Sequence, residues 1–418
     1  MLIGRDRPYY GWTLVVGLGV ITIIVYGTVQ YFFGVLVVPV GRELGWSRAE
    51  LSLSYSTSLA LAGLLGLPLG RWIDRRGAQG VLALGSLLGG LSLIALSRVH
   101  ALWQWELLWG GGLGLAGAMT LYPVTMTVVA NWFHRRRGTA MATLTVLGGL
   151  ASPIFIPLAG WLVPHVGWRQ TLVLFGLAQL LIALPLALLL VRRHPEDVGL
   201  FPDGAPSAGR AASHPEMGVE LRPAVRRPAF WTLTLTASVG LGGSNAIFAH
   251  QVAYMIGRGQ PPEVAASLAG AIGLASLPGR LVLNLLSDRL PAQRLLAASQ
   301  CVLAMGVGAL ALGGSLAGLL AYVVIFGAAF GTSAPLIASV RAEHFGRRAF
   351  ASIGAVQGIP ALGGAALGPL AAGWTYDRAG SYVPALLAVA ALYVVSAAAM
   401  FRTPRPARFT APPLPGGA

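Results

Sequence analysis

Arg280 is the first candidate for chemistry because it lies in the middle of an otherwise apolar stretch, 265–287. If this stretch crosses a bilayer, a charge at that depth costs about 2.5–3.5 kcal/mol on insertion scales and points to a function. The guanidinium carries five donors in a rigid fork that fits a carboxylate with two parallel hydrogen bonds. Ser276, Arg280 and Asn284 are spaced four residues apart, so a helix places them on one face. We expect Arg280, with Ser276, to bind an anionic substrate.

A packing role is the alternative for Arg280, in which backbone carbonyls or a distant acid bind the guanidinium. Glu106 lies inside an apolar run, but near the end of that run. Because no acid lies in the middle of a run, we favour an exogenous anion as the partner of Arg280.

His250 and Asn245 are polar residues of a second apolar run, 229–256. The neutral and protonated forms of histidine interconvert near physiological pH, so His250 can carry a proton as well as contact a substrate. We therefore predict a proton-coupling role for His250 together with Arg280. A packed neutral histidine is the alternative. Asn245, nearer the middle of the run, either binds substrate or ties helices together.

Three further residues are candidates for substrate binding. Tyr122 precedes Pro123, which removes a backbone hydrogen bond and tends to kink a helix. A phenol beside a kink can donate to a carboxylate, although packing is the reading that we favour for Tyr122. Gln357 and Tyr382, in or beside the last two apolar runs, complete the set.

The composition indicates an all-α membrane protein. The 418 residues are 55% hydrophobic and only 10% charged, whereas soluble domains average about 25% charged residues. Apolar runs of spanning length recur twelve times, and each is near the ~20 residues that a bilayer core demands of a helix. The expected spans are 12–40, 49–72, 79–97, 102–131, 138–163, 170–191, 229–256, 264–287, 294–312, 316–340, 350–375 and 382–401.

The distribution of arginine predicts the orientation. All 29 basic residues are arginine; with the N-terminus inside, 22 fall in inner connections, 6 in outer ones and Arg280 within a run. The positive-inside rule then predicts a multi-pass protein of the inner membrane with both termini in the cytoplasm. Topology accounts for the net charge of +15, so we expect no nucleic-acid partner. The single cysteine, Cys301, excludes disulfides and thiolate metal sites within the chain.

A polar, proline-rich linker, 192–228, divides the chain into six-helix halves, 1–191 and 229–402, with a tail, 403–418, that we expect to be disordered. Several motifs of the first half recur in the second at offsets of 212 to 214 residues. Two parallel halves around a central site are a transporter architecture. The repeated pairs are GRWIDRRG (70–77) with NLLSDRLP (284–291), TLYPVTM (120–126) with TSAPLIA (332–338), and NWFHRRRG (131–138) with EHFGRRAF (343–350).

The block GRWIDRRG and its weaker copy NLLSDRLP resemble the signature loop of the major facilitator superfamily. Four finer features are similar to the monocarboxylate-transporter branch: YYGW (9–12), NWFHRRRGTAMA (131–142), PEDVGLFPDG (195–204) and the intramembrane Arg280. The resemblance covers nearly the whole chain. It implies the major facilitator fold, with twelve transmembrane helices in two pseudo-symmetric six-helix halves.

The resemblance also implies charge contacts that gate the inward side, carried in this sequence by Asp74, Arg75, Asp288 and Arg289. For the arginines, simple topology-setting charge is the alternative. One departure from the branch concerns proton coupling: its proton-coupled members place an aspartate one turn before the corresponding arginine, where this chain has Ser276. Animal members also use a lysine in the first helix, and this chain contains none.

We expect a secondary transporter that moves a small monocarboxylate, of the lactate or pyruvate type, with a proton by alternating access. An anion exchanger that swaps carboxylates, as the related oxalate/formate exchangers do, is the main alternative. A drug or cation exporter would need an intramembrane acid, and a sensor on a transporter fold would need a larger output domain. We expect no enzyme activity, cofactor or metal, and a monomer in the lipid bilayer.

Two motifs are false positives. GLGLAG (112–117) fits a dinucleotide-binding glycine pattern, but it lies inside a spanning run with no preceding strand. The basic run HRRR (134–137) is explained by topology rather than by nucleic-acid binding.

Overall fold

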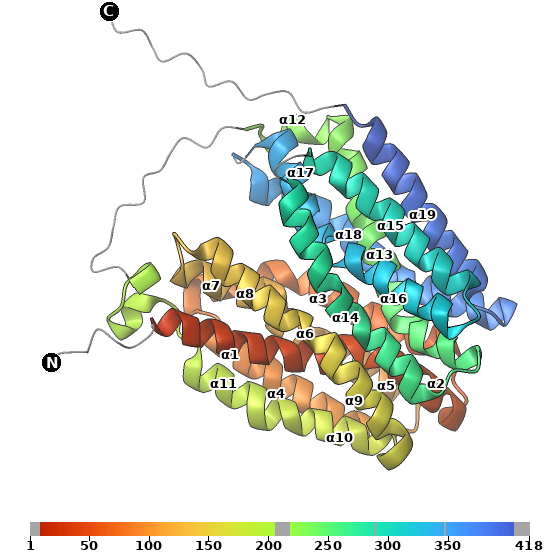
Figure 1. Cartoon of the computed structure of the whole chain (residues 1–418). Helices are drawn as coiled ribbons and strands as arrows, with labels where there is room; N and C mark the ends of the chain where they lie inside the picture. Colours follow the sequence, from red (N-terminus) through yellow and green to blue (C-terminus); the bar gives the residue numbers. More distant parts are fainter. Residues whose placement is uncertain (1–8, 205–217, 288–289, 347, 405–418) are drawn as a thin grey trace, which may run out of the picture. The chain divides into compact units, whose positions relative to one another are not determined.

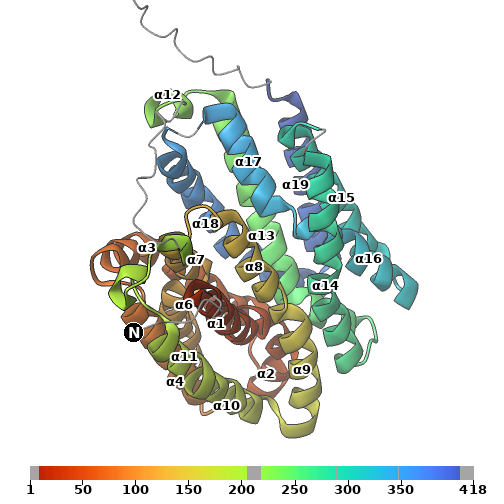
Figure 2. The ribbon, with the colours of Figure 1, turned by 60° about the vertical axis from the view of Figure 1, so that its left-hand side comes forward.

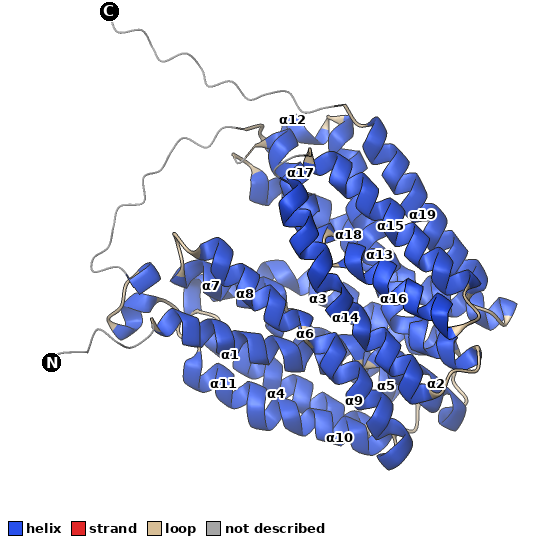
Figure 3. Cartoon of the chain, in the orientation of Figure 1, coloured by secondary structure: helices blue, strands red, loops and turns tan. Residues whose placement is uncertain are grey.

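The computed structural model describes residues 9–204, 218–287, 290–346 and 348–404. Within these ranges every regular element is a helix (Figure 3), and the one β-bridge joins Gly218 to Gly346 outside any strand. The prediction of an all-α protein is thereby confirmed.

The helices follow the predicted apolar runs closely. In the N-terminal part they are α1 (Tyr10–Val25), a π-helical stretch η1 (Tyr26–Tyr31), α2 (Phe33–Leu44), α3 (Arg48–Arg76), α4 (Gln79–Leu96), α5 (Leu102–Trp105), η2 (Glu106–Leu113), α6 (Gly114–Thr120), α7 (Tyr122–Trp132), α8 (Arg137–Gly149), α9 (Ala151–Val166), α10 (Trp168–Ala178), η3 (Gln179–Ala183) and α11 (Leu184–Leu190).

The linker and the C-terminal part contribute the remaining elements (Figure 1). These are the short η4 (Pro195–Val198), η5 (Pro202–Gly204) and α12 (Leu221–Val225), followed by α13 (Pro228–Gly257), α14 (Pro262–Ser287), α15 (Ala292–Leu312), α16 (Leu316–Phe330), α17 (Ser333–Phe345), α18 (Phe350–Ala379) and α19 (Val383–Arg402).

Nine helical runs among the described residues are long and apolar enough to cross a membrane. Three more helices, α3, α13 and α14, have 29, 30 and 26 residues and correspond to the other three predicted spans. At 1.5 Å per residue, helices of this length exceed the ~30 Å of a bilayer core. In the described part of the chain, nine of the twelve predicted spans therefore meet both criteria, and the other three are helices of sufficient length.

Two spans are broken where the sequence places a proline. Leu121 is extended between α6 and α7, with Pro123 in the first turn of α7. Gly331 and Thr332 separate α16 from α17, close to Pro335, but both keep right-handed helical dihedral angles, so this interruption is the milder of the two. These prolines are aligned by the sequence repeat, so both halves interrupt a helix at equivalent points. Broken helices expose backbone polar groups inside a bundle, as transporter sites require.

Contacts divide the chain into two compact units. Unit 1 comprises Met1–Arg210, Asn245–Leu274 and Ala366–Tyr382, and unit 2 comprises Ala211–Ser244, Ala275–Ala365 and Val383–Ala418. Helices α13, α14 and α18 each contribute to both units. The division into sequence halves, 1–191 and 229–402, is a separate prediction about the repeat and stays a prediction.

In unit 1, α4 packs against α6, α10 and α11, and α3 packs along α6. In unit 2, α15 lies beside both α16 and α19, as both ribbon views show (Figures 1 and 2). The arginine distribution assigns one end of each span to the outside. We call these ends the arginine-poor ends, because the connections there hold 6 arginines, against 22 at the opposite ends.

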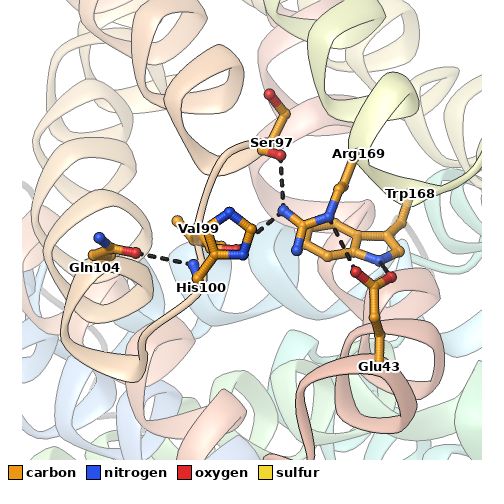
Figure 4. Close-up of polar contacts among 7 residues, drawn as sticks. All are labelled: Glu43, Ser97, Val99, His100, Gln104, Trp168 and Arg169. Atoms are coloured by element: carbon orange, nitrogen blue, oxygen red, sulfur yellow. Dashed lines mark hydrogen bonds and ion pairs between the residues drawn. The ribbon is translucent and has the colours of Figure 1, made fainter.

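The arginine-poor end of unit 1 is fastened by one ion pair and its neighbours (Figure 4). Arg169 Nε lies 3.1 Å from Glu43 Oε1, and Arg169 Nη1 donates to the carbonyls of Ser97 and Val99 at 2.8 and 3.0 Å. Trp168 Nε1 donates to the other Glu43 oxygen at 2.5 Å. Because these bonds join α2, α10 and the connection after α4, they hold three segments of the unit together.

Candidate functional site

Arg280 lies in unit 2 where α14 crosses the break between α16 and α17. A Cβ added to Gly331 would lie 2.9 Å from both Arg280 Nε and Ser276 Cβ, so both side chains pass directly beside Gly331. Ser276 is 1% exposed, whereas Arg280 is only partly buried. The sequence-predicted pair is therefore brought to one place, with part of Arg280 accessible.

The backbone around Arg280 explains how the helices come so close. A Cβ on Gly279 would lie 2.7 Å from the carbonyl carbon of Ala328 and 2.9 Å from its Cα, so only glycine fits there. Gly331 follows the last residue of α16, and the carbonyl end of a helix carries about half a negative charge. That partial charge favours a cation, which offsets part of the cost of placing Arg280 at this depth.

The other members of the Arg280 face and the predicted gate are described only in part. The backbone of Asn284 continues α14, but its side chain lies outside the described residues, as does the side chain of Asp74. Arg75 is exposed at the end of α3. Asp288 and Arg289 lie outside the described residues altogether. The gating role of these four residues stays a prediction.

His250 and Tyr382, two predicted site residues, lie together in unit 1. His250 Nδ1 is 3.1 Å from Tyr382 Oη, and His250 Nε2 is 2.9 Å from the Pro369 carbonyl and 3.2 Å from Ser52 Oγ. Because a carbonyl only accepts, we assign the hydrogen of neutral His250 to Nε2, which leaves Nδ1 to accept from the tyrosine hydroxyl. The imidazole is 3% exposed.

Asn245 is hydrogen-bonded to two polar residues that were not predicted as site residues from the sequence. Its Oδ1 accepts from Gln30 Nε2 at 3.0 Å and from Tyr55 Oη at 3.2 Å. Tyr55 in turn stacks on Phe33, with ring centroids 4.6 Å apart. Gln30 could have been found from the sequence, because it is a glutamine within the first apolar run, 12–40, and a buried amide needs a hydrogen-bond partner.

Tyr122 belongs to an aromatic group at the α6–α7 break. Its ring lies 4.8 Å from that of Tyr26, which is 6.3 Å from Tyr31, and Tyr31 is 5.2 Å from Phe248. The Tyr122 hydroxyl is 3.5 Å from the Thr145 carbonyl. Tyr26 and Tyr31 bound the π-helical stretch η1, a distortion that often marks functional positions.

Gln357 links three helices of unit 2. Its Oε1 accepts from Arg341 Nε at 2.9 Å, its Nε2 donates to the Phe230 carbonyl at 3.2 Å, and its side chain is 1% exposed. Arg341 also lies over the Phe350 ring, 5.2 Å from its centroid. These contacts join α13, α17 and α18. A substrate role for Gln357 stays a prediction, and any substrate would have to compete with Arg341.

Two of the motifs that carry the family resemblance contact each other in unit 1. The carboxylate of Asp203, in 195–204, accepts the backbone N–H groups of His134, Arg135 and Arg136 at 2.9, 2.7 and 3.1 Å. Asp203 adopts φ 59°, a left-handed conformation that few residues other than glycine tolerate. The linker thus holds the turn between α7 and α8 from a distant part of the chain.

The pKa values of the groups at this contact follow from its geometry. Partial burial opposes ionisation of Asp203, but the three N–H donors prevail and hold the pKa of Asp203 below its ordinary value. The Tyr9 hydroxyl donates to the Trp132 carbonyl at 3.0 Å. Burial and the adjacent Asp203 carboxylate raise the pKa of Tyr9 to about 12. Both groups therefore keep one protonation state at neutral pH.

Among the described residues, no cluster of His, Cys, Asp and Glu side chains is arranged to hold a metal ion. The polar groups inside the two units are a partly exposed arginine in unit 2, and a histidine–tyrosine pair and an amide network in unit 1. These groups can offer hydrogen bonds and, in the case of the arginine, a positive charge.

The chain is similar in sequence to known proteins over most of its length. Residues 18–365 match the Major Facilitator Superfamily. Monocarboxylate transporter 13 of Bos taurus is 26% identical over 407 residues, which cover 96% of this chain and 91% of that protein. Monocarboxylate transporter 11 of Mus musculus is 27% identical over 358 residues, 82% of this chain and 76% of that protein.

The fold is shared with solved transporters. The nucleoside transporter NupG superposes with a TM-score of 0.74 at 15% identity, covering 93% of this chain and 99% of that one. At this identity the likeness concerns the fold alone.

Proposed function

Since the chain belongs to the Major Facilitator Superfamily and is a transporter rather than an enzyme, we propose that it moves a small monocarboxylate together with a proton. The substrate would be of the lactate or pyruvate type, and the mechanism alternating access. The position of Arg280 beside the α16–α17 break carries this proposal.

The charge of the site favours one carboxylate. Arg280 offers a planar fork that binds a carboxylate with two bonds, and the α16 carbonyl end beside it supplies partial rather than full negative charge. One cation neutralises one carboxylate. A dicarboxylate would leave a second charge unpaired at low dielectric, which is costly.

The relatives support the same substrate class. Two proteins that align over most of this chain are named monocarboxylate transporters, from Bos taurus and Mus musculus. At 26% and 27% identity this likeness supports a class of substrate rather than a particular acid.

We propose His250 as the proton carrier, because the lone pair of its Nδ1, which accepts a hydrogen bond from Tyr382, can bind a proton instead. A proton on Nδ1 turns this nitrogen into a donor, so the Tyr382 hydroxyl, 3.1 Å away, would have to reverse its own role. Ser276 stands where proton-coupled members of the branch place an aspartate, so the proposal assigns the proton to the imidazole of His250 instead of a carboxylate.

Uptake by proteoliposomes tests the proposal. Labelled lactate or pyruvate should accumulate when the outside is acidified, and His250→Ala should abolish this pH-driven accumulation while substrate binding partly survives. Unchanged accumulation in His250→Ala would remove His250 from the mechanism.

The same experiment separates symport from exchange. The absence of an aspartate one turn before Arg280 favours an exchanger as the second candidate, since exchange needs no protonatable residue. Uptake that requires internal carboxylate and ignores the pH gradient would establish exchange. We further propose that the protein is a monomer of the inner membrane with cytoplasmic termini.

A further inference from the structure

The arginine-poor ends of three helices meet around His250. The imidazole, on α13, lies within hydrogen-bond distance of Ser52 on α3 and of the Pro369 carbonyl on α18, at 3.2 and 2.9 Å. Its other nitrogen is 3.1 Å from Tyr382, which precedes α19. All four residues belong to unit 1. One buried side chain therefore joins helices from both ends of the sequence.

Asp377 makes a second link between the same helices. Its two carboxylate oxygens accept the backbone N–H groups of Arg48 and Ala49, at 3.0 and 2.7 Å. These groups open α3, so Asp377 on α18 places a negative charge at the positive end of the α3 dipole. Bonds from a carboxylate to helix N–H groups are charge-assisted and stronger than neutral ones.

Close packing leaves no room between α3 and α18 at this level. A Cβ on Gly373 would lie 2.8 Å from the Arg48 carbonyl oxygen and 2.8 Å from Ser52 Oγ. The Arg48 guanidinium lies 5.6 Å from the centroid of Tyr376, and Tyr376 stacks on Tyr382 at 4.3 Å. Glycine at 373 thus permits the contact, and the charged and polar groups on either side fasten it.

We propose that Asp377, His250, Ser52 and Tyr382 form a latch that holds the arginine-poor ends of α3, α13 and α18 together. The latch must open before a solute can enter or leave by that end. It rests on the chain being a transporter and on its predicted orientation, but not on the identity of the substrate. It also gives His250 a mechanical role, because any event that disturbs its hydrogen bonds loosens the closed end.

Ser56, one helical turn after the latch residue Ser52, can report when the latch opens. Ser56 follows Ser52 by four residues on α3, so it faces the same way. Its side chain is 5% exposed, and its hydroxyl has no hydrogen-bond partner among the residues that the structure describes. Ser56→Cys is nearly isosteric and removes no bond. Combined with Cys301→Ala, it gives a protein with one thiol.

The experiment measures how fast a membrane-impermeant maleimide labels the thiol introduced by Ser56→Cys, in intact cells and in inside-out vesicles. Asp377→Ala and His250→Phe should each raise labelling in intact cells by about tenfold or more, equivalent to about 1.4 kcal/mol. Tyr382→Phe should raise it by less, and inside-out vesicles should show no rise. Thr375→Val is the matched control, because the Thr375 hydroxyl donates to the Ala371 carbonyl of its own helix, at 2.7 Å, and does not link α18 to another helix through that bond.

Labelling in Asp377→Ala and His250→Phe that stays at the Thr375→Val rate, in both preparations, would overturn the latch. Asp377→Asn guards against a misfolded alanine variant: it keeps the shape of the side chain, and it too should label faster while eluting as a monodisperse species. Faster labelling without any lactate or pyruvate uptake by the unmodified protein would leave the latch standing and refute the proposed substrate.

Discussion

Arg280 is an example of a residue that the sequence reveals by its position but cannot explain. A charge in an apolar run was enough to select it. The helix break beside it belongs to another span, so the close approach of Gly331 could not be predicted from local sequence. The same holds for Asn245, whose partners Gln30 and Tyr55 lie far away in the chain. Sequence identifies polar residues in apolar runs, whereas tertiary packing decides their partners.

Gly279 provides a test of how Arg280 is positioned. A Cβ at this site would meet the Ala328 backbone at 2.7 to 2.9 Å, and backbone cannot yield without moving a helix. We expect Gly279→Ala to push α14 from α16 and to lower monocarboxylate affinity about tenfold or more. Overpacking of this kind also costs about 1–3 kcal/mol of stability.

Gly308→Ala is the control, since a Cβ there meets nothing within 4 Å and alanine favours a helix. Affinity and melting temperature, measured on both purified variants, should fall only for Gly279→Ala. Equal affinities would mean that the α14–α16 contact does not position Arg280.

At the scale of elements, the helices were predictable and their distortions were not. Each span follows from an apolar run long enough to cross a bilayer, and the two breaks follow from Pro123 and Pro335. The π-helical stretch Tyr26–Tyr31 carries no such local signal. Nor did composition reveal that the proline-rich linker begins with an ordered segment, because Asp203 acts on backbone groups of a distant turn.

The linker segment should stabilise the turn before α8. Asp203→Ala removes the acceptor of three backbone N–H groups, so we expect a loss of about 1 kcal/mol, the net contribution of a typical hydrogen bond. Glu196→Ala removes an exposed acid from the same linker and should leave the melting temperature unchanged. Thermal unfolding in detergent measures both. Equal melting temperatures for the two variants would show that the Asp203 contact contributes nothing.

The contribution of Asp203 should depend on pH. Its pKa is lowered in the folded protein, so its stabilisation is complete above the unfolded value of about 3.9. That stabilisation disappears as the pH falls through the lower folded pKa. The difference in melting temperature between the wild type and Asp203→Ala should therefore be constant near neutrality and shrink only in strong acid. A difference that shrinks between pH 8 and 6 would point to another group.

At the scale of the whole molecule, two independent patterns agree on a transporter. The repeated motifs predict two related halves, and the family match over residues 18–365 places the chain in a superfamily of transporters. The arginine distribution predicts an orientation in the membrane. Its physical basis lies in the membrane, because positively charged loops are retained on the cytoplasmic side.

Reporter fusions test that orientation. Alkaline phosphatase fused after Gly259, in the connection between α13 and α14, should be active because this connection is predicted to lie outside. The same enzyme fused after Arg402 should be inactive, and green fluorescent protein fused there should fluoresce. The reverse pattern would invert the topology and move the latch to the cytoplasmic side.

The central claim is that Arg280 binds the carboxylate of the substrate, and the most direct test is the affinity of purified Arg280→Gln for lactate or pyruvate. Two charge-assisted bonds are lost, so we predict that affinity falls about 100-fold or more. Arg98→Gln, which changes an exposed arginine of a connection, should bind as the wild type does. Affinity of Arg280→Gln within about threefold of that control would contradict the claim, since each tenfold change corresponds to about 1.4 kcal/mol.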